Sequence, residues 1–451
     1  MHAQDTTPSG PVYVVQSGDT VWGIAARFDV AVEDILAVNH LTDANEIYVG
    51  DRLVIPGLEG LSGILSSQTV PYGETLRSLS RLYSVDEALL RKLNHIVSPA
   101  ELFAGSNLIL LQQEGEASWP ARANLSPGST LLELAVLQDT HPWVLTEINK
   151  LPGTWAALPG DILYLPSGSS TAAPTGMPPA FTMAEVIPLP IIQGTTVQIR
   201  LQTSQPVTLG GVLVDQPLHF FENEDGSWIA LQGVHALLEP GLYPLRIEAT
   251  LPDGNKQTFE QMVLVVSGYY PEDPILYVDA DTLEPTITEQ ENQIILSYVS
   301  VANAQRYWSG DFITPASQYA ESTYYTSRFG NRRTYIGKGT DIRVEKFHTG
   351  LDFGGGTGLP ITAPAAGKVV FKDFLNVYGN ATIIDHGWGV YSGFWHQSEI
   401  LVEVGDSVET GQIIGLVGGT GRVTGAHLHW ELWVNGVQVD PLTWLEDPFP
   451  R

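Results

Sequence analysis

The sequence predicts a multidomain protein made of three small βααβ modules, an all-β sandwich and a mainly antiparallel-β C-terminal domain. Three observations predict this fold class. A pattern of glycine, threonine and asparagine occurs three times in the N-terminal third, strand-like alternation with turn signals follows it, and five of the eleven histidines lie between His348 and His429. A chain of 451 residues is long enough for about three domains.

Composition and charge exclude several classes of partner and site. The chain has 50 acidic and 22 basic residues, which gives a formal net charge of -28. Such a chain is repelled by nucleic acid and by anionic membrane surfaces, so we expect neither as a partner. There is no cysteine, so any metal must be held by histidine and carboxylate side chains. No apolar run is long enough to span a bilayer, and we expect a monomer.

The first ten residues, MHAQDTTPSG, lack the basic and apolar regions of a signal peptide. Two interpretations fit this start: a cytoplasmic protein, or a mature chain whose signal was removed and to which an initiator methionine was added. The domain content described below favours the second. We expect residues 1–11 to be disordered.

The repeat in the N-terminal third keeps its register across three copies without gaps. Its first glycines, Gly18, Gly73 and Gly128, are 55 residues apart each time (73 − 18 and 128 − 73). Three further positions recur at the same offsets: Thr20, Thr75 and Thr130; Asn39, Asn94 and Asn149; Gly50, Gly105 and Gly160. Each copy predicts a short strand, a glycine turn, a helix after the threonine, a second helix ending near the asparagine, and a closing strand.

These copies resemble the lysin motif, a βααβ module that binds glycan chains containing N-acetylglucosamine. The resemblance places three modules at residues 12–57, 67–113 and 122–167. The first matches the motif well and the other two diverge from it. They either bind sugar too or keep only the fold, as spacers. For the first module, the resemblance implies glycan contacts by four residues: Gly18, Asp19, Thr20 and Asn39.

The middle of the chain predicts a linker, a sandwich and a connector. Residues 168–180 are small residues and proline, which is typical of a linker. Alternating stretches such as TTVQIRLQT predict a β-sandwich over 181–270, which resembles the immunoglobulin-like or fibronectin-like spacers of bacterial surface proteins. Residues 271–307 form the connector, where the pattern after Pro285 predicts a helix.

Three histidine-bearing elements in the last third predict a metal or acid–base site. In FHTGLDFGGG, His348 and Asp352 are four residues apart, but the glycines favour a strand and a tight turn over a helix. In HLHWEL, a strand places His427 and His429 on the same face. A third histidine, His396, closes an aromatic-rich strand. Histidines clustered with a carboxylate indicate a metal site.

The order of these elements, with SRFG before them and VGDSVETGQIIGLVG before the last, resembles the lysostaphin-type zinc endopeptidases, which cut peptidoglycan. The resemblance covers residues 308–451 and implies one zinc ion held by His348, Asp352 and His429. It also implies two catalytic histidines. We expect His427 to help deprotonate water and His396 to stabilise the oxyanion or protonate the leaving amine. Exchanging these two roles fits the sequence equally well.

The resemblance therefore predicts a secreted, wall-associated zinc endopeptidase that glycan-binding modules direct to peptidoglycan. The bond that is cut is a glycine bridge, a direct D-alanyl cross-link or a bond within the stem peptide. Two alternatives keep the same fold. The chain acts as a catalytically silent scaffold that activates other wall enzymes, or its active site is masked in the full-length chain by a segment such as Asn331–Val344.

Overall fold

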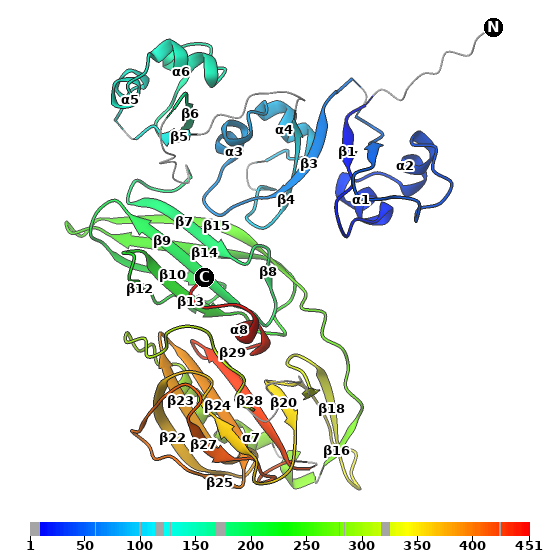
Figure 1. Ribbon diagram of the computed structural model, residues 1–451, viewed down its shortest axis with the longest axis vertical. Helices are drawn as coiled ribbons and strands as arrows, with labels where there is room; N and C mark the ends of the chain where they lie inside the picture. The colour runs from blue at the N-terminus through cyan, green and yellow to red at the C-terminus, as the bar shows by residue number, and fades with distance from the viewer. Residues whose placement is uncertain are drawn as a thin grey trace. The chain divides into compact units, whose positions relative to one another are not determined.

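The computed structural model (Figure 1) describes residues 10–451 except 59, 99–100, 113–120, 127, 168–175, 279, 284, 317–324 and 424. Residues 1–9 of the segment predicted to be disordered, and residues 168–175 of the linker predicted at 168–180, lie outside the described residues. The chain forms two compact units. The first is Met1–Ala184 with Thr203–Gln205, and the second is Glu185–Gln202 with Pro206–Arg451.

The first unit contains three βααβ substructures, one for each copy of the repeat. They are β1 (Val12–Val14), α1 (Val21–Phe28), α2 (Val32–Val38) and β2 (Arg52–Val54); β3 (Ile64–Thr69), α3 (Leu76–Tyr83), α4 (Glu87–Leu93) and β4 (Asn107–Gln112); and β5 (Ala121–Asn124), α5 (Leu131–Leu137), α6 (Pro142–Ile148) and β6 (Ile162–Leu165). Strands β1 and β3 pair in parallel, so the first two substructures share a sheet of order β2-β1-β3-β4.

The repeated residues have the same structural task in each copy. The repeated threonine caps the first helix; Thr20, for example, accepts a hydrogen bond from the backbone N–H of Gly23 at 3.0 Å. The repeated asparagine ties the second helix to the closing strand. Asn39 exchanges hydrogen bonds with the backbone of Val54, its Nδ2 donating and its Oδ1 accepting. The repeated glycines have positive φ, which favours glycine.

Two sheets follow along the chain, mostly within the second unit. They consist of β7 (Phe181–Ile187), β8 (Ile191–Ile192), β9 (Thr196–Thr203), β10 (Thr208–Leu213), β11 (Gln216–Pro217), β12 (Phe221–Glu222), β13 (Trp228–Gly233), β14 (Gly241–Thr250) and β15 (Lys256–Val266). The strand orders are β11-β10-β14-β15-β8 and β12-β13-β9-β7. An all-β region therefore occupies the predicted sandwich, while its immunoglobulin-like character stays a prediction.

The connector contains β16 (Leu276–Val278) and α7 (Pro285–Val299), so the helix predicted after Pro285 is confirmed. The C-terminal part follows with β17 (Tyr325–Ser327), β18 (Arg332–Gly337), β19 (Arg343–Phe347), β20 (Leu351–Gly354), β21 (Pro360–Thr362), β22 (Gly367–Leu375), β23 (Gly379–Gly387), β24 (Val390–Gln397), β25 (Glu399–Ile400), β26 (Ser407–Val408), β27 (Ile413–Leu416), β28 (His427–Val434), β29 (Val437–Val439) and α8 (Leu442–Glu446).

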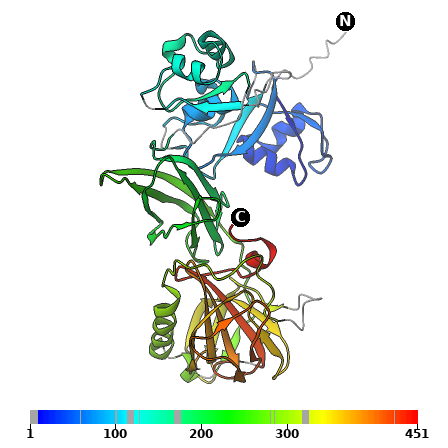
Figure 2. The same cartoon turned by 60° about the vertical axis from the view of Figure 1, so that its left-hand side comes forward.

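A large sheet positions the site. Its order is β17-β20-β28-β24-β23-β22-β26, and all the pairings given for it are antiparallel, in keeping with the mainly antiparallel prediction. One face packs against α7 (Figure 2) through an apolar cluster that includes Ile295, Phe371 and Trp395. The main core lies on the other side and also takes in Ile229 and Leu231 of β13, so the sandwich and the C-terminal sheet share one core.

Candidate metal centre

A tight turn between β19 and β20 presents the first two site residues. His348 directly follows β19, and Asp352 is the second residue of β20. Between them, Gly350 lies so close to β28 that a Cβ atom there would be 2.2 Å from the Trp430 carbonyl oxygen. Only glycine allows this approach, and it brings β20 into register with β28. The prediction of a strand and turn in place of a helix is confirmed.

Strand β28 supplies the next two histidines on one face. His427 and His429 both line the groove that also contains His348 and Asp352. Leu428 and Trp430, which alternate with them, are fully buried in the main core. This alternation is the one predicted from their spacing. In the antiparallel pairing of β20 with β28, Asp352 lies directly opposite His429. The ladder therefore sets a carboxylate beside an imidazole.

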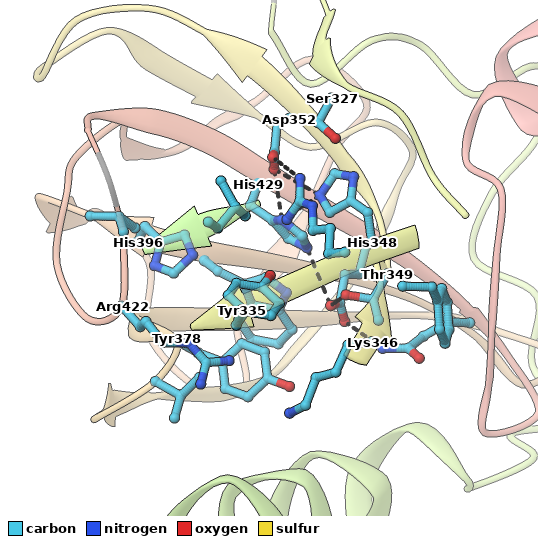
Figure 3. A pocket seen from close by; sticks show the side chains of 18 of the residues that line it. Ser327, Tyr335, Lys346, His348, Thr349, Asp352, Tyr378, His396, Arg422 and His429 are labelled. Atoms are coloured by element: carbon cyan, nitrogen blue, oxygen red, sulfur yellow. Dashed lines mark hydrogen bonds and ion pairs between the residues drawn. The ribbon is translucent and has the colours of Figure 1, made fainter. Parts of the chain in front are cut away.

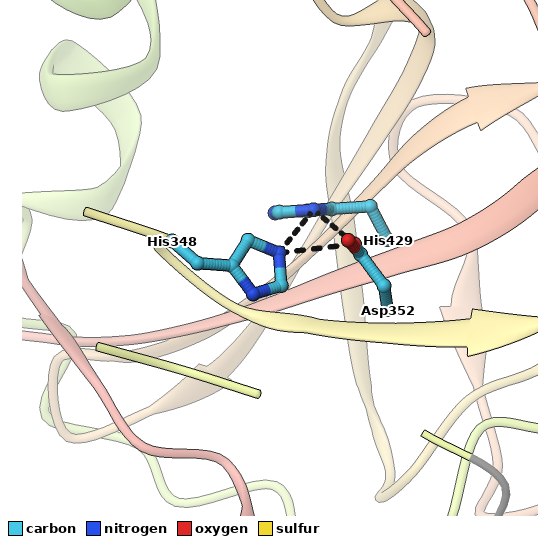
Figure 4. A group of neighbouring side chains, drawn as sticks. All are labelled: His348, Asp352 and His429. Atoms are coloured by element: carbon cyan, nitrogen blue, oxygen red, sulfur yellow. Dashed lines mark hydrogen bonds and ion pairs between the residues drawn. The ribbon is translucent and has the colours of Figure 1, made fainter. Parts of the chain in front are cut away.

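Three potential ligand atoms converge at this point (Figure 4). Nε2 of His348 is 3.0 Å from Oδ1 of Asp352 and 3.1 Å from Nδ1 of His429, and the last two atoms are 2.7 Å apart. Two donors bound tetrahedrally to one ion at zinc-ligand distances would be about 3.4 Å apart. The donor types and their spacing thus fit a divalent metal such as zinc, and all three side chains are buried.

In the imidazoles of His348 and His429, the ring nitrogen that points away from the cluster donates a hydrogen bond. The other ring nitrogen is therefore available to bind a metal. Nδ1 of His348 donates to the Arg328 carbonyl oxygen at 2.8 Å. Nε2 of His429 donates to the carboxylate of Glu431 at 3.2 Å. Such outer partners fix the tautomer and the ring orientation of a metal-binding histidine.

Two further charged groups complete this arrangement. Glu431 is fully buried, and its carboxylate also accepts hydrogen bonds from Thr349, Trp433 and Gln438. On the other side, Arg333 of β18 donates to Oδ2 of Asp352 at 2.9 Å. This bond leaves the other oxygen of Asp352 to face the histidines.

The electrostatics of the cluster favour a cation. Burial lowers the pKa of His429, but the neighbouring Asp352 carboxylate and the hydrogen bonds to Asp352 and Glu431 outweigh burial and raise the pKa to about 9. Burial would raise the pKa of Asp352, yet the imidazoles of His348 and His429 hold it well below its usual range. Two carboxylates around these histidines therefore call for positive charge, which a metal ion supplies.

The remaining two histidines lie beside the cluster. The rings of His396 and His427 are 5.2 Å apart, and Nε2 of His427 is 3.5 Å from Oδ1 of Asp352. Their Nδ1 atoms donate to carbonyl oxygens, of Thr420 for His396 and of Gly425 for His427. In the tautomer that donates from Nδ1, the Nε2 atom of each ring is the one that can accept a proton. Burial lowers the pKa of His396 to about 3, which keeps its ring neutral.

His396 adopts an unusual backbone conformation, with φ of 62°. Its backbone N–H donates to the Tyr378 carbonyl oxygen at 2.8 Å, and its side chain donates to Thr420. A non-glycine residue in the left-handed region persists only where its surroundings hold it there, and such residues concentrate at functional sites.

All five residues line one groove of about 920 Å³ (Figure 3). Its walls come from several elements: β18 and β19, the loop after β22, α7, and His235 and Leu237 of the sandwich region. His235 packs edge-on against Phe347, next to His348. The region predicted to be only a spacer therefore contributes directly to a wall of the groove.

The structure thus gathers His348, Asp352, His396, His427 and His429 in one groove, while their roles as metal ligands and catalytic histidines stay predictions. Two neighbours were missed. Glu431 continues the alternation of His427 and His429 on β28, so the spacing of two could have found it. Arg333 carries no comparable signal, because its contact with Asp352 depends on how β18 packs.

The residues predicted to bind glycan lie in the first unit, and their polar groups are engaged within their own module. Asp19 accepts hydrogen bonds from Tyr13 and Arg27, Thr20 caps α1, and Asn39 binds the backbone of Val54. Gly18 forms the turn with φ of 87°. Their role in binding glycan stays a prediction.

Comparison with known proteins identifies two kinds of domain in the chain. Residues 346–441 match Peptidase family M23, and residues 13–56 and 69–110 match the LysM domain, so the LysM match covers the first two of the three βααβ substructures. The chain is 39% identical over 121 residues to the DD-carboxypeptidase/endopeptidase Mpg of Neisseria meningitidis serogroup B, which is 27% of each protein.

Two further similarities cover a similar share of the chain. It is 41% identical over 98 residues to the peptidoglycan DD-endopeptidase ShyC of Vibrio cholerae, covering 22% of this chain and 23% of that protein. It is 34% identical to the solved catalytic domain of lysostaphin from Staphylococcus simulans, covering 22% of this chain and 80% of that one, with a TM-score of 0.22. The chain spans about a quarter of the length of the curated relatives it matches. The chain therefore contains a Peptidase family M23 domain at residues 346–441, and LysM domains precede that domain in the same chain.

Proposed function

We propose that this protein is a secreted, zinc-dependent endopeptidase that cleaves peptide bonds in the stems or cross-bridges of peptidoglycan. The convergence of His348, Asp352 and His429, with His396 and His427 in the same groove, carries this proposal. The names of the relatives, a DD-carboxypeptidase/endopeptidase and a peptidoglycan DD-endopeptidase, support a peptide of the cell wall as substrate.

His348, Asp352 and His429 hold the metal in this proposal. Three protein ligands leave a position open for catalysis, and zinc at such a site acidifies water and polarises a carbonyl oxygen. The partners at Arg328, Arg333 and Glu431 keep the ligand side chains aimed inward. Their burial also keeps bulk water away from the ligands.

The two catalytic histidines move protons. Nε2 of His427 is the better placed to accept a proton from water, because it lies near Asp352 and its side chain is partly exposed at 19%. His396 is more buried; its Nε2 would take up a proton during the reaction, and the protonated ring would then stabilise the oxyanion or give the proton to the leaving amine. Both rings are held by backbone carbonyl oxygens, so neither must reorganise during the reaction.

The LysM domains bring the enzyme to its substrate in this proposal. The first module binds glycan, with Gly18, Asp19, Thr20 and Asn39 as the predicted contacts, and the third βααβ substructure is a divergent member of the same set. Among the described helices, none has the length and apolar character needed to span a membrane. We place the protein outside the cell, at the wall, as a monomer.

Digestion of purified cross-linked peptidoglycan tests this function. The whole chain is compared as isolated, after chelation and after zinc is returned, and released fragments are identified by mass spectrometry. We expect cleavage that is lost on chelation and restored by zinc, and the fragment masses name the bond. Full activity of zinc-free protein, or no cleavage of any wall type, would overturn the proposal and favour a silent scaffold.

A further inference from the structure

The groove contains basic side chains that the proposed catalytic steps do not use. Lys346 of β19 and Arg422, in the loop between β27 and β28, both line it together with the five site residues (Figure 3). Lys346 is two residues before His348. Alternation along an extended chain therefore places both on the same side, roughly 7 Å apart along the backbone. Arg333 also lines the groove but is engaged by Asp273 and Asp352, so Lys346 and Arg422 are the basic residues whose role there is not yet assigned.

The acidic residues of the groove are already engaged elsewhere. Asp273 binds Arg333, Asp352 faces the histidines, and Glu431 is buried beneath them. Glu345 points to solvent and pairs with Arg343 at 2.9 Å. None of these carboxylates therefore neutralises Lys346.

Lys346 itself is half-buried, and no described carboxylate lies within 4.0 Å of its ammonium group. The carboxylate whose charge influences the Lys346 ammonium group is that of Glu289 in α7. It is exposed and accepts a hydrogen bond from Gln293. Arg422 lies within electrostatic range of Lys346 and adds positive charge. Partial burial of the Lys346 ammonium group costs free energy, which a bound anion would offset.

Arg422 is held in place by its surroundings. Its backbone N–H donates to the Val377 carbonyl oxygen at 2.8 Å, next to Tyr378, and its guanidinium lies over the ring of Tyr335 at 5.6 Å from the ring centroid. An arginine held over an aromatic ring loses little further freedom when it binds a carboxylate. Its planar fork also matches a carboxylate in two-point contact.

We propose that Lys346 and Arg422 form a carboxylate-binding subsite in the groove, which selects wall peptides that carry a free carboxylate near the bond to be cut. This inference rests on the proposed function and narrows its substrate class. Wall stem peptides end in, or branch through, amino acids with free carboxylates, whereas a glycine bridge offers none. The subsite therefore favours a stem peptide or a direct cross-link over a glycine bridge.

Binding tests the subsite separately from catalysis. Soluble cross-linked peptide fragments released from peptidoglycan are used untreated and after their carboxylates have been converted to carboxamides. Their binding to the zinc-loaded full chain carrying His427→Ala, which prevents turnover, is measured by calorimetry. We expect the untreated fragments to bind at least about tenfold more tightly, because a hydrogen bond to a charged group contributes about 1.5 kcal/mol or more.

Variants identify the residues responsible. Adding Lys346→Met and Arg422→Gln should abolish the difference between the two fragment sets, while Lys256→Met, on the sandwich, should keep it. Unchanged zinc content and melting temperature show that the variants fold. Equal binding of both sets by the parent chain, no binding of either, or a difference that persists in the double variant would overturn the subsite. If the His427→Ala chain binds untreated fragments more tightly than amidated ones, but the unmodified chain cleaves no wall, the proposed endopeptidase function is wrong and the subsite stands.

Discussion

Arg333 connects two carboxylates that the sequence places far apart. Its Nε donates to Asp273 of the connector at 3.0 Å, and its Nη2 donates to Asp352 at 2.9 Å. Asp273 also accepts from Ser327 and Asn331, so the arginine is fixed at its outer end. Removing it would leave one oxygen of Asp352 buried without its charged partner, and the carboxylate would be free to turn away from the histidines.

We therefore expect Arg333→Gln to weaken zinc binding by about 10- to 100-fold, the usual effect of losing a partner of a metal ligand. Competition with a chromogenic chelator measures the zinc affinity, and the gain in melting temperature on adding zinc gives a second readout. The neighbouring Arg332 is exposed, so Arg332→Gln is the matched control and should bind zinc normally. Equal zinc affinities in the two variants would show that Arg333 does not position Asp352.

Residues whose role follows from local spacing were predictable, and those that depend on packing were not. A strand with residues two apart places His427 and His429 together, and the glycines around Asp352 argue against a helix. No local rule pairs Asp352 with His429, because that contact comes from the register of β20 against β28. The family resemblance supplied that pairing, but it gave neither Arg333 nor Glu431.

At the scale of elements, α7 holds the loop that supports His396. The Glu291 carboxylate is buried and accepts hydrogen bonds from the backbone N–H groups of Asn376 and Val377. Asn292 accepts a further bond from the Tyr378 hydroxyl. The Tyr378 carbonyl oxygen in turn accepts from the backbone of His396, so a helix in the connector reaches the catalytic histidine through three successive residues of one loop.

Glu291→Gln should loosen this loop, because an amide offers one acceptor oxygen where the carboxylate offers two. We expect a loss of about 1–3 kcal/mol in the free energy of unfolding and a lower kcat with unchanged zinc content. Denaturant unfolding and kinetics on peptidoglycan fragments measure these effects. Glu409→Gln, at an exposed glutamate that does not line the groove, is the control. A variant that loses stability but keeps its full kcat would limit Glu291 to a structural role.

Asp440, which lies just before α8, makes the free energy of unfolding depend on pH. Burial raises the pKa of Asp440 to about 6, while its carboxylate accepts from the backbone N–H of Leu442. A raised pKa means that the folded state binds the proton more tightly than the unfolded state does. The contribution of Asp440 to stability is therefore complete below its unfolded pKa of about 3.8 and is lost as the pH rises through 6.

Asp440→Asn keeps an oxygen for Leu442 and removes the ionisation. We expect the variant to be more stable than the parent by about 1–3 kcal/mol above pH 7, and the difference should shrink as the pH falls toward 5. Chemical unfolding of both chains at several pH values measures it, and taking the difference at each pH cancels the titration of other groups. A difference that does not vary between pH 5 and 8 would contradict the assignment.

At the scale of the whole molecule, the sandwich and the C-terminal sheet are joined by more than a linker. Ile229 and Leu231 of β13 are buried in the main core, Trp444 donates to the Thr196 hydroxyl, and Gln198 exchanges hydrogen bonds with the backbone of Arg451. The strand patterns of the sequence predicted the two regions. They could not predict the shared core, because local periodicity shows which side of a strand is apolar but not which element packs against it.

A fragment that begins at residue 308 would lose these contacts. We expect residues 308–451 to be at least about 2 kcal/mol less stable than residues 177–451, because several fully buried apolar side chains would lose part of their cover. Thermal unfolding with zinc present compares the two fragments. Equal stability would show that the sandwich contributes little to the core. If residues 308–451 fold poorly, their low activity would reflect unfolding. The hypothesis that the active site is masked in the full-length chain should then be tested with residues 177–451.

We expect the LysM domains to make a different kind of contribution, by binding the glycan of the wall. A fragment of residues 177–451 lacks them and should cleave soluble wall peptides as fast as the full chain, but it should digest intact, insoluble peptidoglycan more slowly, by about tenfold or more. Binding to glycan converts encounter with the stem peptide into an intramolecular event with a high effective concentration.

The full chain has a net charge of -28, so general attraction to the anionic polymers of a Gram-positive wall cannot hold it there. Sedimentation of the full chain with purified walls should therefore change little between low and high salt. A steep loss of binding with salt would indicate a charge-driven contact in place of sugar recognition. Equal digestion of intact walls by the full chain and the fragment would remove the modules from the targeting role.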